Sequence, residues 1–171
     1  MATTNNIWVG VDPGKTGAVA LVVPTSSEVR MADTPVLVEA GKKTAYDHQG
    51  MRRLLLDFTQ GRAVGVLVVI EAQQAMPKQG ATSGFTTGMG YGLWLGLLAG
   101  LQIPFKIVQP AGWKKRLMDG EPRTAQASVA VALRHYPTLR DQLVGPKGGL
   151  KDGRADALLL AHYGRLFFSG S

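Results

Sequence analysis

Four carboxylates stand at places where they could act together in catalysis. Asp12 ends an apolar, β-branched run at a Pro-Gly turn, and Glu71 directly follows the most apolar run of the chain. An acid at the end of a buried strand loses its hydration unless something compensates the charge. Asp152 and Asp156 are four residues apart, so they share one face of a helix. The four side chains could converge on a hard cation, and an all-oxygen site of this kind suits Mg²⁺ or Mn²⁺.

Each of these acids also has a simpler interpretation. Asp12 could only initiate a turn, Asp152 could only cap a helix, and Asp156 could pair with a neighbouring base such as Arg154. Glu71 is the hardest to explain in this way, because it follows an uninterrupted apolar strand. The order strand-Asp, strand-Glu, helix-Asp is therefore more specific than any one acid alone.

The composition narrows the class of protein. The chain has 171 residues, which predicts one domain with a sizeable core. The absence of Cys excludes disulfides, thiolate metal sites and cysteine nucleophiles, and the presence of only three His argues against a His-rich zinc site. A net charge of +7 suggests an anionic partner, first nucleic acid and second a membrane surface. No signal peptide or membrane span is visible, so a soluble intracellular protein is expected.

Hydrophobic periodicity predicts alternating strands and helices in one α/β domain, residues 1–171, with a core of about 7–168. The expected strands are 7–12, 17–23, 28–35, 64–70 and 105–108. The expected helices are 48–59, 85–101, 110–118, 124–135 and 152–168. Segments 40–46 and 72–84 are expected to be loops, and the second is long enough to suggest a function.

Glycine recurs every four residues along the helix expected at 85–101. The series is Gly84, Gly88, Gly92, Gly96 and Gly100. Glycine in a helix is less favourable than alanine by about 1 kcal/mol. We therefore expect tight packing of another backbone against this strip to offset the loss.

Three of these segments resemble the RuvC-type Holliday junction resolvases of the RNase H-like superfamily. Val9 to Gly14 followed by Gly17 to Ala20 resembles the first hairpin of that family. Val69-Ile70-Glu71 resembles its second acidic position, and Gly153 to Ala161 resembles its C-terminal Asp-Ala-Leu helix. The resemblance implies an RNase H-like mixed five-stranded sheet flanked by helices.

Further matches are to the plant monokaryotic chloroplast resolvase group. The chain shares a Gly-Tyr-Gly-Leu-Trp stretch at 90–94, a Trp-Lys pair at 113–114 and a Tyr-Gly pair at 163–164. It departs from the family at Gly153, where a fourth acid or a His often stands three residues before the helix Asp. The long N-terminal extension of the chloroplast proteins is not in this sequence. An organelle nucleoid is expected if this is a plant protein trimmed of its transit peptide, and a bacterial or phage cytoplasm otherwise.

The resemblance implies phosphodiester hydrolysis with two Mg²⁺ or Mn²⁺ ions. One ion activates a water and the other stabilises the leaving oxygen, about 4 Å apart. Asp12 would bridge the ions, Glu71 would bind one of them, and Asp152 and Asp156 would bind the other. The substrate would be a four-way DNA junction cut by symmetric paired nicks, and the enzyme would be a homodimer with the glycine-rich helix as its candidate interface.

DNA contacts are expected outside the acidic site. Basic side chains that could bind phosphates are Lys114, Lys115, Arg116 and Arg123. Side chains of the 73–87 segment that could read bases or wedge between them are Gln73, Gln74, Met76, Lys78, Gln79 and Phe85. The three histidines fall outside the matching motifs.

Other functions remain open on the same fold. The chain could be a different RNase H-like nuclease, such as one that cuts RNA in a hybrid, or a non-catalytic module that binds nucleic acid. An ATPase or sugar kinase of the actin/Hsp70 type also begins with a strand-Asp-x-Gly hairpin, but it needs two such domains and this chain is too short for them.

Overall fold

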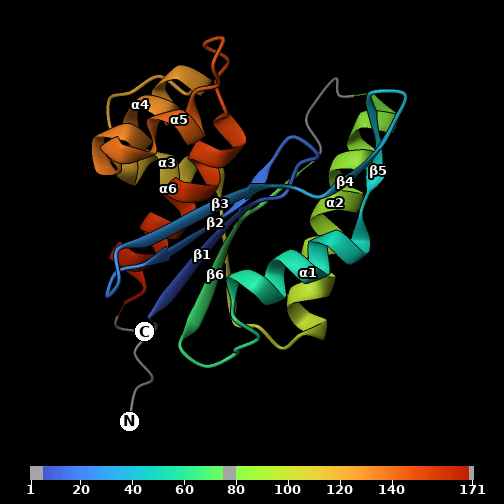
Figure 1. The fold of residues 1–171 in the computed structure, drawn as a ribbon, viewed down its shortest axis with the longest axis horizontal. Coiled ribbons are helices and arrows are strands. Elements are labelled where there is room, and N and C mark those ends of the chain that lie inside the picture. Colours follow the sequence, from blue (N-terminus) through green and yellow to red (C-terminus); the bar gives the residue numbers. More distant parts are fainter. Residues whose placement is uncertain (1–5, 75–79, 170–171) are drawn as a thin grey trace.

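The computed structural model describes residues 6–74 and 80–169, and its centre is a five-stranded mixed sheet (Figure 1). The strand order is β3-β2-β1-β6-β7, with β1 antiparallel to β2 and parallel to β6. The strands are β1 (Ile7–Asp12), β2 (Ala18–Val23), β3 (Glu28–Asp33), β6 (Val66–Glu71) and β7 (Phe105–Val108). The expected α/β architecture is confirmed, with strand ends within two residues of the predicted ones.

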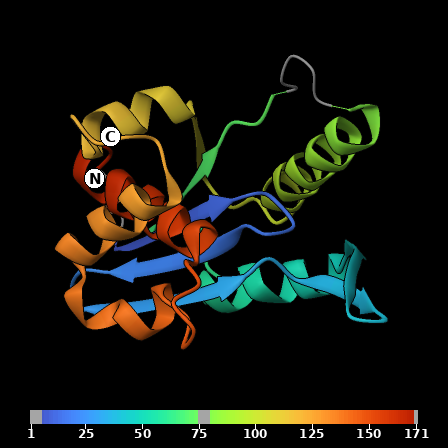
Figure 2. The same cartoon turned by 90° about the horizontal axis from the view of Figure 1, so that it is seen from above.

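Helices cover both faces of this sheet (Figure 2). On one face lie α1 (His48–Phe58) and α2 (Ala81–Gly100), and on the other α3 (Pro110–Leu117), α4 (Ala125–His135) and α6 (Asp152–Phe167). The short helices η1 (Pro137–Leu139) and α5 (Arg140–Leu143) follow α4. Along β1, Trp8 belongs to the core beneath α6 while Val9 belongs to the core beneath α1 and α2. Burial of both faces explains why the central strands are continuously apolar.

Helix α6 lies unusually close to β1 because two glycines make room for it. A β-carbon at Gly10 would stand 1.9 Å from the carbonyl oxygen of Ala157, and one at Gly153 would stand 2.4 Å from the carbonyl oxygen of Thr16. Only glycine allows such a backbone approach. These two contacts therefore fix the height of α6 above the sheet.

The expected loop at 40–46 is wrong, because the chain forms a second, two-stranded sheet there. Strands β4 (Val36–Glu39) and β5 (Lys42–Tyr46) pair antiparallel around Ala40 and Gly41, which both have positive φ angles. Two positive φ angles define the tight turn that suits a two-residue hairpin. Alanine rarely adopts this conformation, so the sequence contains no strong hairpin signal.

Helix α2 differs from the prediction in its start and in its glycine strip. It begins at Ala81 rather than Phe85. A β-carbon at Gly88, Gly92, Gly96 or Gly100 would meet no atom of residues 6–74 or 80–169 within 4 Å, so the expected tight packing against this strip is wrong for the described part of the chain. The buried side of α2 carries Gly90, Trp94 and Leu98 instead.

No helix in the described ranges combines the length and the apolar character needed to cross a bilayer.

Candidate active site

Asp12 and Glu71 lie side by side because of the register between their strands. Val11 pairs with Ile70 in the parallel ladder of β1 and β6, so the two acids are the next residues at the same edge of the sheet. Both strands end there, and each acid is only partly accessible at the end of a fully buried run. The sequence prediction of two acids at neighbouring strand ends is thus matched by the register.

Helix α6 adds Asp156 to this edge. The backbone of Ala157 rests against Gly10 of β1, so the preceding turn of the helix lies over the end of the strand. Asp156 and Glu71 both act electrostatically on Asp12, which places the three carboxylates in one cluster. We call Asp12, Glu71 and Asp156 the acidic cluster.

Helix α3 provides two polar contacts to the acidic cluster, and the segment after β6 provides a third. Strand β7 ends at Val108 opposite Glu71, and α3 begins two residues later. The indole Nε1 of Trp113 donates a 2.8 Å hydrogen bond to Oε2 of Glu71, and the Nζ of Lys114 lies 2.8 Å from Oδ2 of Asp156. From the end of β6, Gln73 Nε2 donates to the other oxygen of Glu71 at 3.2 Å.

The environment raises the pKa values of Asp12 and Glu71. Burial raises the pKa of Asp12 to about 7, and the negative charges of Asp156 and Glu71 add to the rise. A backbone hydrogen bond from Gly14 and the charge of Lys114 oppose this rise. Burial also raises the pKa of Glu71, against the hydrogen bond from Trp113. Such carboxylates resist ionisation unless a cation accompanies them.

The acidic cluster offers the carboxylate oxygens that a divalent ion requires as ligands. In this structure the ammonium group of Lys114 lies beside one of these carboxylates. Oδ1 of Asp156 is buried and has no hydrogen-bond partner among the described residues. Carboxylate oxygens are the ligands that Mg²⁺ and Mn²⁺ prefer. Within residues 6–74 and 80–169, no three acidic or histidine side chains converge closely enough to enclose an ion. Lys114 contributes the positive charge beside Asp156 in this state.

Asp152 is the fourth predicted metal ligand, and its surroundings consist of residues outside the acidic cluster. It is the first residue of α6 and is exposed, and it lines a hollow with Thr16, Asp33 and Arg154. Arg154 forms a two-armed ion pair with Asp33, with Nε–Oδ1 at 2.6 Å. The simpler interpretation, in which Asp156 pairs with the neighbouring Arg154, is wrong. Asp156 pairs with Lys114, and Arg154 pairs with Asp33.

The structure also explains the departure at Gly153. Its backbone rests on the turn between β1 and β2, where a side chain would collide with Thr16 and Gly17. An acid or a histidine at this position would not fit without moving α6. The family pattern of a ligand three residues before the helix Asp is therefore incompatible with this backbone.

The predicted DNA-binding residues separate into groups. Lys114, Lys115 and Arg123 line one hollow near the acidic cluster, whereas Arg116 points to α6, where its guanidinium lies 5.0 Å from the Phe167 ring. The structure therefore places Lys114 inside the acidic site, not outside it as expected. Residues that line a second hollow at the start of α2 include Gln73 and Gln74, and Phe85 is 72% exposed on the same helix turn. Met76, Lys78 and Gln79 lie outside the described residues.

Two side chains near the site were missed by the sequence analysis. Trp113 was noted only as part of a motif, and nothing in its surroundings indicated a bond to Glu71. Tyr46 is 3% exposed, donates a 3.3 Å hydrogen bond to the carbonyl of Thr86, and has its pKa raised by burial and by the charge of Asp12. Gly90 lies against its hydroxyl, where a β-carbon would stand 2.1 Å away. The shared Gly-Tyr-Gly-Leu-Trp stretch was the available signal for this contact.

Comparison with solved structures finds proteins of similar fold. RuvC from Thermus thermophilus matches with a TM-score of 0.61 and 16% sequence identity, over 95% of each chain. The same protein in complex with a Holliday junction substrate matches with a TM-score of 0.60 and 15% identity, over 95% of this chain and 94% of that one. The yeast mitochondrial Holliday junction resolvase matches with a TM-score of 0.52 and 15% identity, over 91% of this chain and 75% of that one.

These likenesses confirm the RuvC-type, RNase H-like fold that the sequence motifs predicted. No protein-family model and no curated protein sequence matches this chain.

Proposed function

We propose that this protein is a divalent-metal-dependent endonuclease that cuts four-way DNA junctions. The observation that carries the proposal is the acidic cluster, which joins two strand ends and one helix on a RuvC-type sheet. Its raised pKa values and its partnerless Asp156 oxygen are the properties of carboxylates suited to binding cations. A thermophilic protein of the same fold has been solved with a Holliday junction substrate, which supports this choice of DNA. The closer kinship with the plant chloroplast group rests on the sequence motifs alone.

In this proposal Asp12, Glu71 and Asp156 hold the ions, and Asp152 contributes through water at most. The bound ions would supply water activation and neutralisation of the charge on the leaving oxygen. Trp113 holds the Glu71 carboxylate in one orientation, because its N–H binds one oxygen and leaves the other to Gln73. Lys114 would leave Asp156 when cations arrive and would then be free to bind the scissile phosphate.

Around this centre, exposed bases and the start of α2 would hold the DNA. Lys115 and Arg123 are exposed beside the hollow that Lys114 lines, so they can reach phosphates. Phosphate contacts give affinity that falls with salt and carries little sequence preference. Phe85 is the exposed apolar side chain suited to wedge between bases near the junction centre.

The direct test uses a synthetic immobile four-way junction, a linear duplex of the same sequence and an RNA–DNA hybrid. We expect paired nicks at symmetric positions of the junction in Mg²⁺ or Mn²⁺, with ends that a ligase can seal. Excess chelator should stop cutting and leave junction binding in place. Cutting restricted to the duplex or to the hybrid would contradict the proposal, and binding without cutting would support the non-catalytic alternative.

We also propose that the protein acts as a homodimer through the exposed glycine strip of α2. Two symmetric nicks require two active sites, which a twofold dimer provides. The strip has no partner within 4 Å in the described chain, although four exposed glycines weaken a helix by about 1 kcal/mol each. The backbone of a second α2 could approach this smooth face closely and compensate for the loss.

Gly92→Ala distinguishes a dimer face from a solvent-exposed helix by the sign of its effect. On an exposed helix the change should stabilise the protein by about 1 kcal/mol. At a close helix–helix contact the added methyl groups should weaken association by about 1–3 kcal/mol, or roughly 5- to 150-fold in the dissociation constant. Sedimentation equilibrium of both proteins measures this constant. Gly112→Ala on α3, where a β-carbon also meets nothing within 4 Å, is the matched control and should leave association unchanged. Unaltered association of Gly92→Ala would rule out this face.

A further inference from the structure

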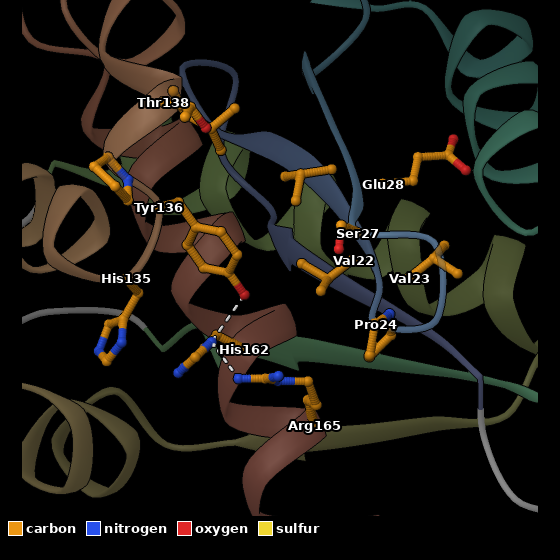
Figure 3. A pocket seen from close by; sticks show the side chains of 13 residues that line it. Val22, Val23, Pro24, Ser27, Glu28, His135, Tyr136, Thr138, His162 and Arg165 are labelled. Carbon is orange, nitrogen blue, oxygen red and sulfur yellow. Dashed lines mark hydrogen bonds between the residues drawn. The ribbon is translucent and has the colours of Figure 1, made fainter.

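A cavity of about 480 Å³ lies at the opposite end of the sheet from the acidic cluster. It is bounded by the turn after β2, by the end of α4 with η1, and by the last turns of α6 (Figure 3). In the register of β1 with β2, Val22 at the cavity is opposite Trp8, four residues before Asp12. At about 3.3 Å per residue the cavity begins about 13 Å from the acidic cluster. Its volume is within the range of small-molecule sites.

One wall of this cavity is a polar group built from the two helices. The hydroxyl of Tyr136 lies 2.8 Å from Nδ1 of His162, and a guanidinium nitrogen of Arg165 lies 3.5 Å from the same atom (Figure 3). The rings of His135 and His162 are 4.3 Å apart. A guanidinium can only donate, so Nδ1 accepts and a neutral His162 carries its proton on Nε2.

Arg165 is the charge that this wall leaves unmatched. Its Nε is buried and has no hydrogen-bond partner in the described part of the chain. Glu28 also lines the cavity, but Figure 3 shows its carboxylate directed away from Arg165. A buried N–H of a charged guanidinium destabilises the fold when it has no acceptor, because it has lost its hydrogen bonds to water and gained none in return. An anion in the cavity would place a negative charge beside this guanidinium, which lines the wall.

The rest of the cavity wall is mixed, with Ser27, Glu28 and Thr138 as its polar residues and a larger set of apolar ones. The apolar part includes Val22, Val23, Pro24, Val29 and Leu139. We propose that this cavity binds a phosphate group carried on a small apolar body, with the phosphate beside Arg165, Tyr136 and the histidine pair. Arginine suits a phosphate because its planar fork donates two parallel hydrogen bonds. No residue of the acidic cluster takes part, so the site is independent of the proposed nuclease activity.

The histidine pair makes binding sensitive to pH. Burial, then the charges of His135 and Arg165, lower the pKa of His162 to about 4. Burial, then Arg134 and Arg165, lower the pKa of His135. Tyr136 is the other titratable group in contact with His162, and Glu28 lines the same cavity with its carboxylate directed away. Both rings are neutral in the free protein at neutral pH. A bound phosphate would raise both pKa values, so affinity should increase as the pH falls from neutral towards the free histidine values.

The experiment follows the histidine ring signals by NMR while phenyl phosphate or inorganic phosphate is added at two pH values. We expect saturable shifts of the His135 and His162 signals, tighter binding of phenyl phosphate than of inorganic phosphate, and tighter binding at the lower pH. Arg165→Met should weaken binding by roughly tenfold or more, as for a lost charge-assisted hydrogen bond. Arg52→Met, which removes an equal charge from the exposed face of α1, should bind like the wild type.

A short DNA duplex forms a separate arm, because a phosphate can also come from a DNA backbone. If the duplex saturates the same signals through Arg165 and phenyl phosphate does not, the phosphate belongs to bound DNA. If neither ligand shifts the histidine signals, or if Arg165→Met binds both unchanged while its unfolding curve matches the wild type, the proposal is wrong. His135→Gln, at the exposed edge of the pair, provides a second variant should Arg165→Met unfold.

Discussion

Asp12→Asn is expected to reduce junction cutting to the level of a no-enzyme control and to stabilise the metal-free protein above pH 7. The cutting activity is lost because the amide of Asn cannot replace the carboxylate that would hold the metal ions together with Glu71 and Asp156. The stability rises because ionised Asp12 is unfavourable in the fold, where burial and two neighbouring acids raise its pKa from 3.8 to about 7. A difference of this size corresponds to at most about 4 kcal/mol.

The sign follows from proton linkage. A carboxyl whose pKa is raised on folding binds its proton more tightly in the native state. Its contribution to stability is complete below about pH 4 and is lost as the pH rises through about 7. The wild-type melting temperature without metal should therefore fall across that window, and the Asp12→Asn curve should lack this part of the decline. At about pH 8 the variant should melt several degrees higher.

The same melting curves with Mn²⁺ or Mg²⁺ test the cation directly. The ion should stabilise the wild type, because it binds the folded state alone, and should stabilise Asp12→Asn less. Asp141→Asn, at an exposed acid of α5, is the control and should change stability by less than about 0.5 kcal/mol. A lower melting temperature for Asp12→Asn at about pH 8, or equal stabilisation of both proteins by the ion, would contradict this account.

The sequence predicted the parts of the site that strand ends define. Asp12 and Glu71 were predictable because an acid that terminates an apolar strand is visible in the sequence, and parallel neighbouring strands bring their ends together. Asp156 followed from its spacing in the Asp-Ala-Leu helix. The surroundings of Asp152 were not predictable, because the start of α6 is positioned by the contact of Gly153 with the β1–β2 turn. No periodicity in the sequence reveals that contact.

Contacts between distant elements could not be predicted for a related reason. In the sequence Lys114 is one of three consecutive bases, and only the packing of α3 beside α6 decides that Lys114 meets Asp156 and Arg116 does not. The four-residue glycine period indicated a smooth helix face but could not tell whether that face pointed inward. In the fold the inward side is set by Trp94 and Leu98, which leaves the glycine strip on the outside.

Gly10→Ala is the second substitution with a large expected effect, because Gly10 sets the distance between the strand of Asp12 and the helix of Asp156. The new β-carbon would stand 1.9 Å from the Ala157 carbonyl oxygen and 2.6 Å from the backbone nitrogen of Ala161. Neither atom belongs to a flexible side chain, so the whole of α6 must move outward. Overpacking against backbone in a dense core destabilises by about 3 kcal/mol or more.

The variant should also lose activity under conditions where it remains folded. An outward shift of α6 carries Asp156 away from Asp12 and Glu71, whereas catalytic groups tolerate displacements of only about 1 Å before rates fall roughly 100-fold. Urea unfolding gives the stability, and junction cutting well below the melting temperature gives the activity. Gly112→Ala makes the same chemical change on α3 where the β-carbon meets nothing within 4 Å, so it should be neutral or stabilising by up to about 1 kcal/mol. Wild-type stability and cutting in Gly10→Ala would mean that α6 has freedom over β1 and that the acidic cluster is not held by this contact.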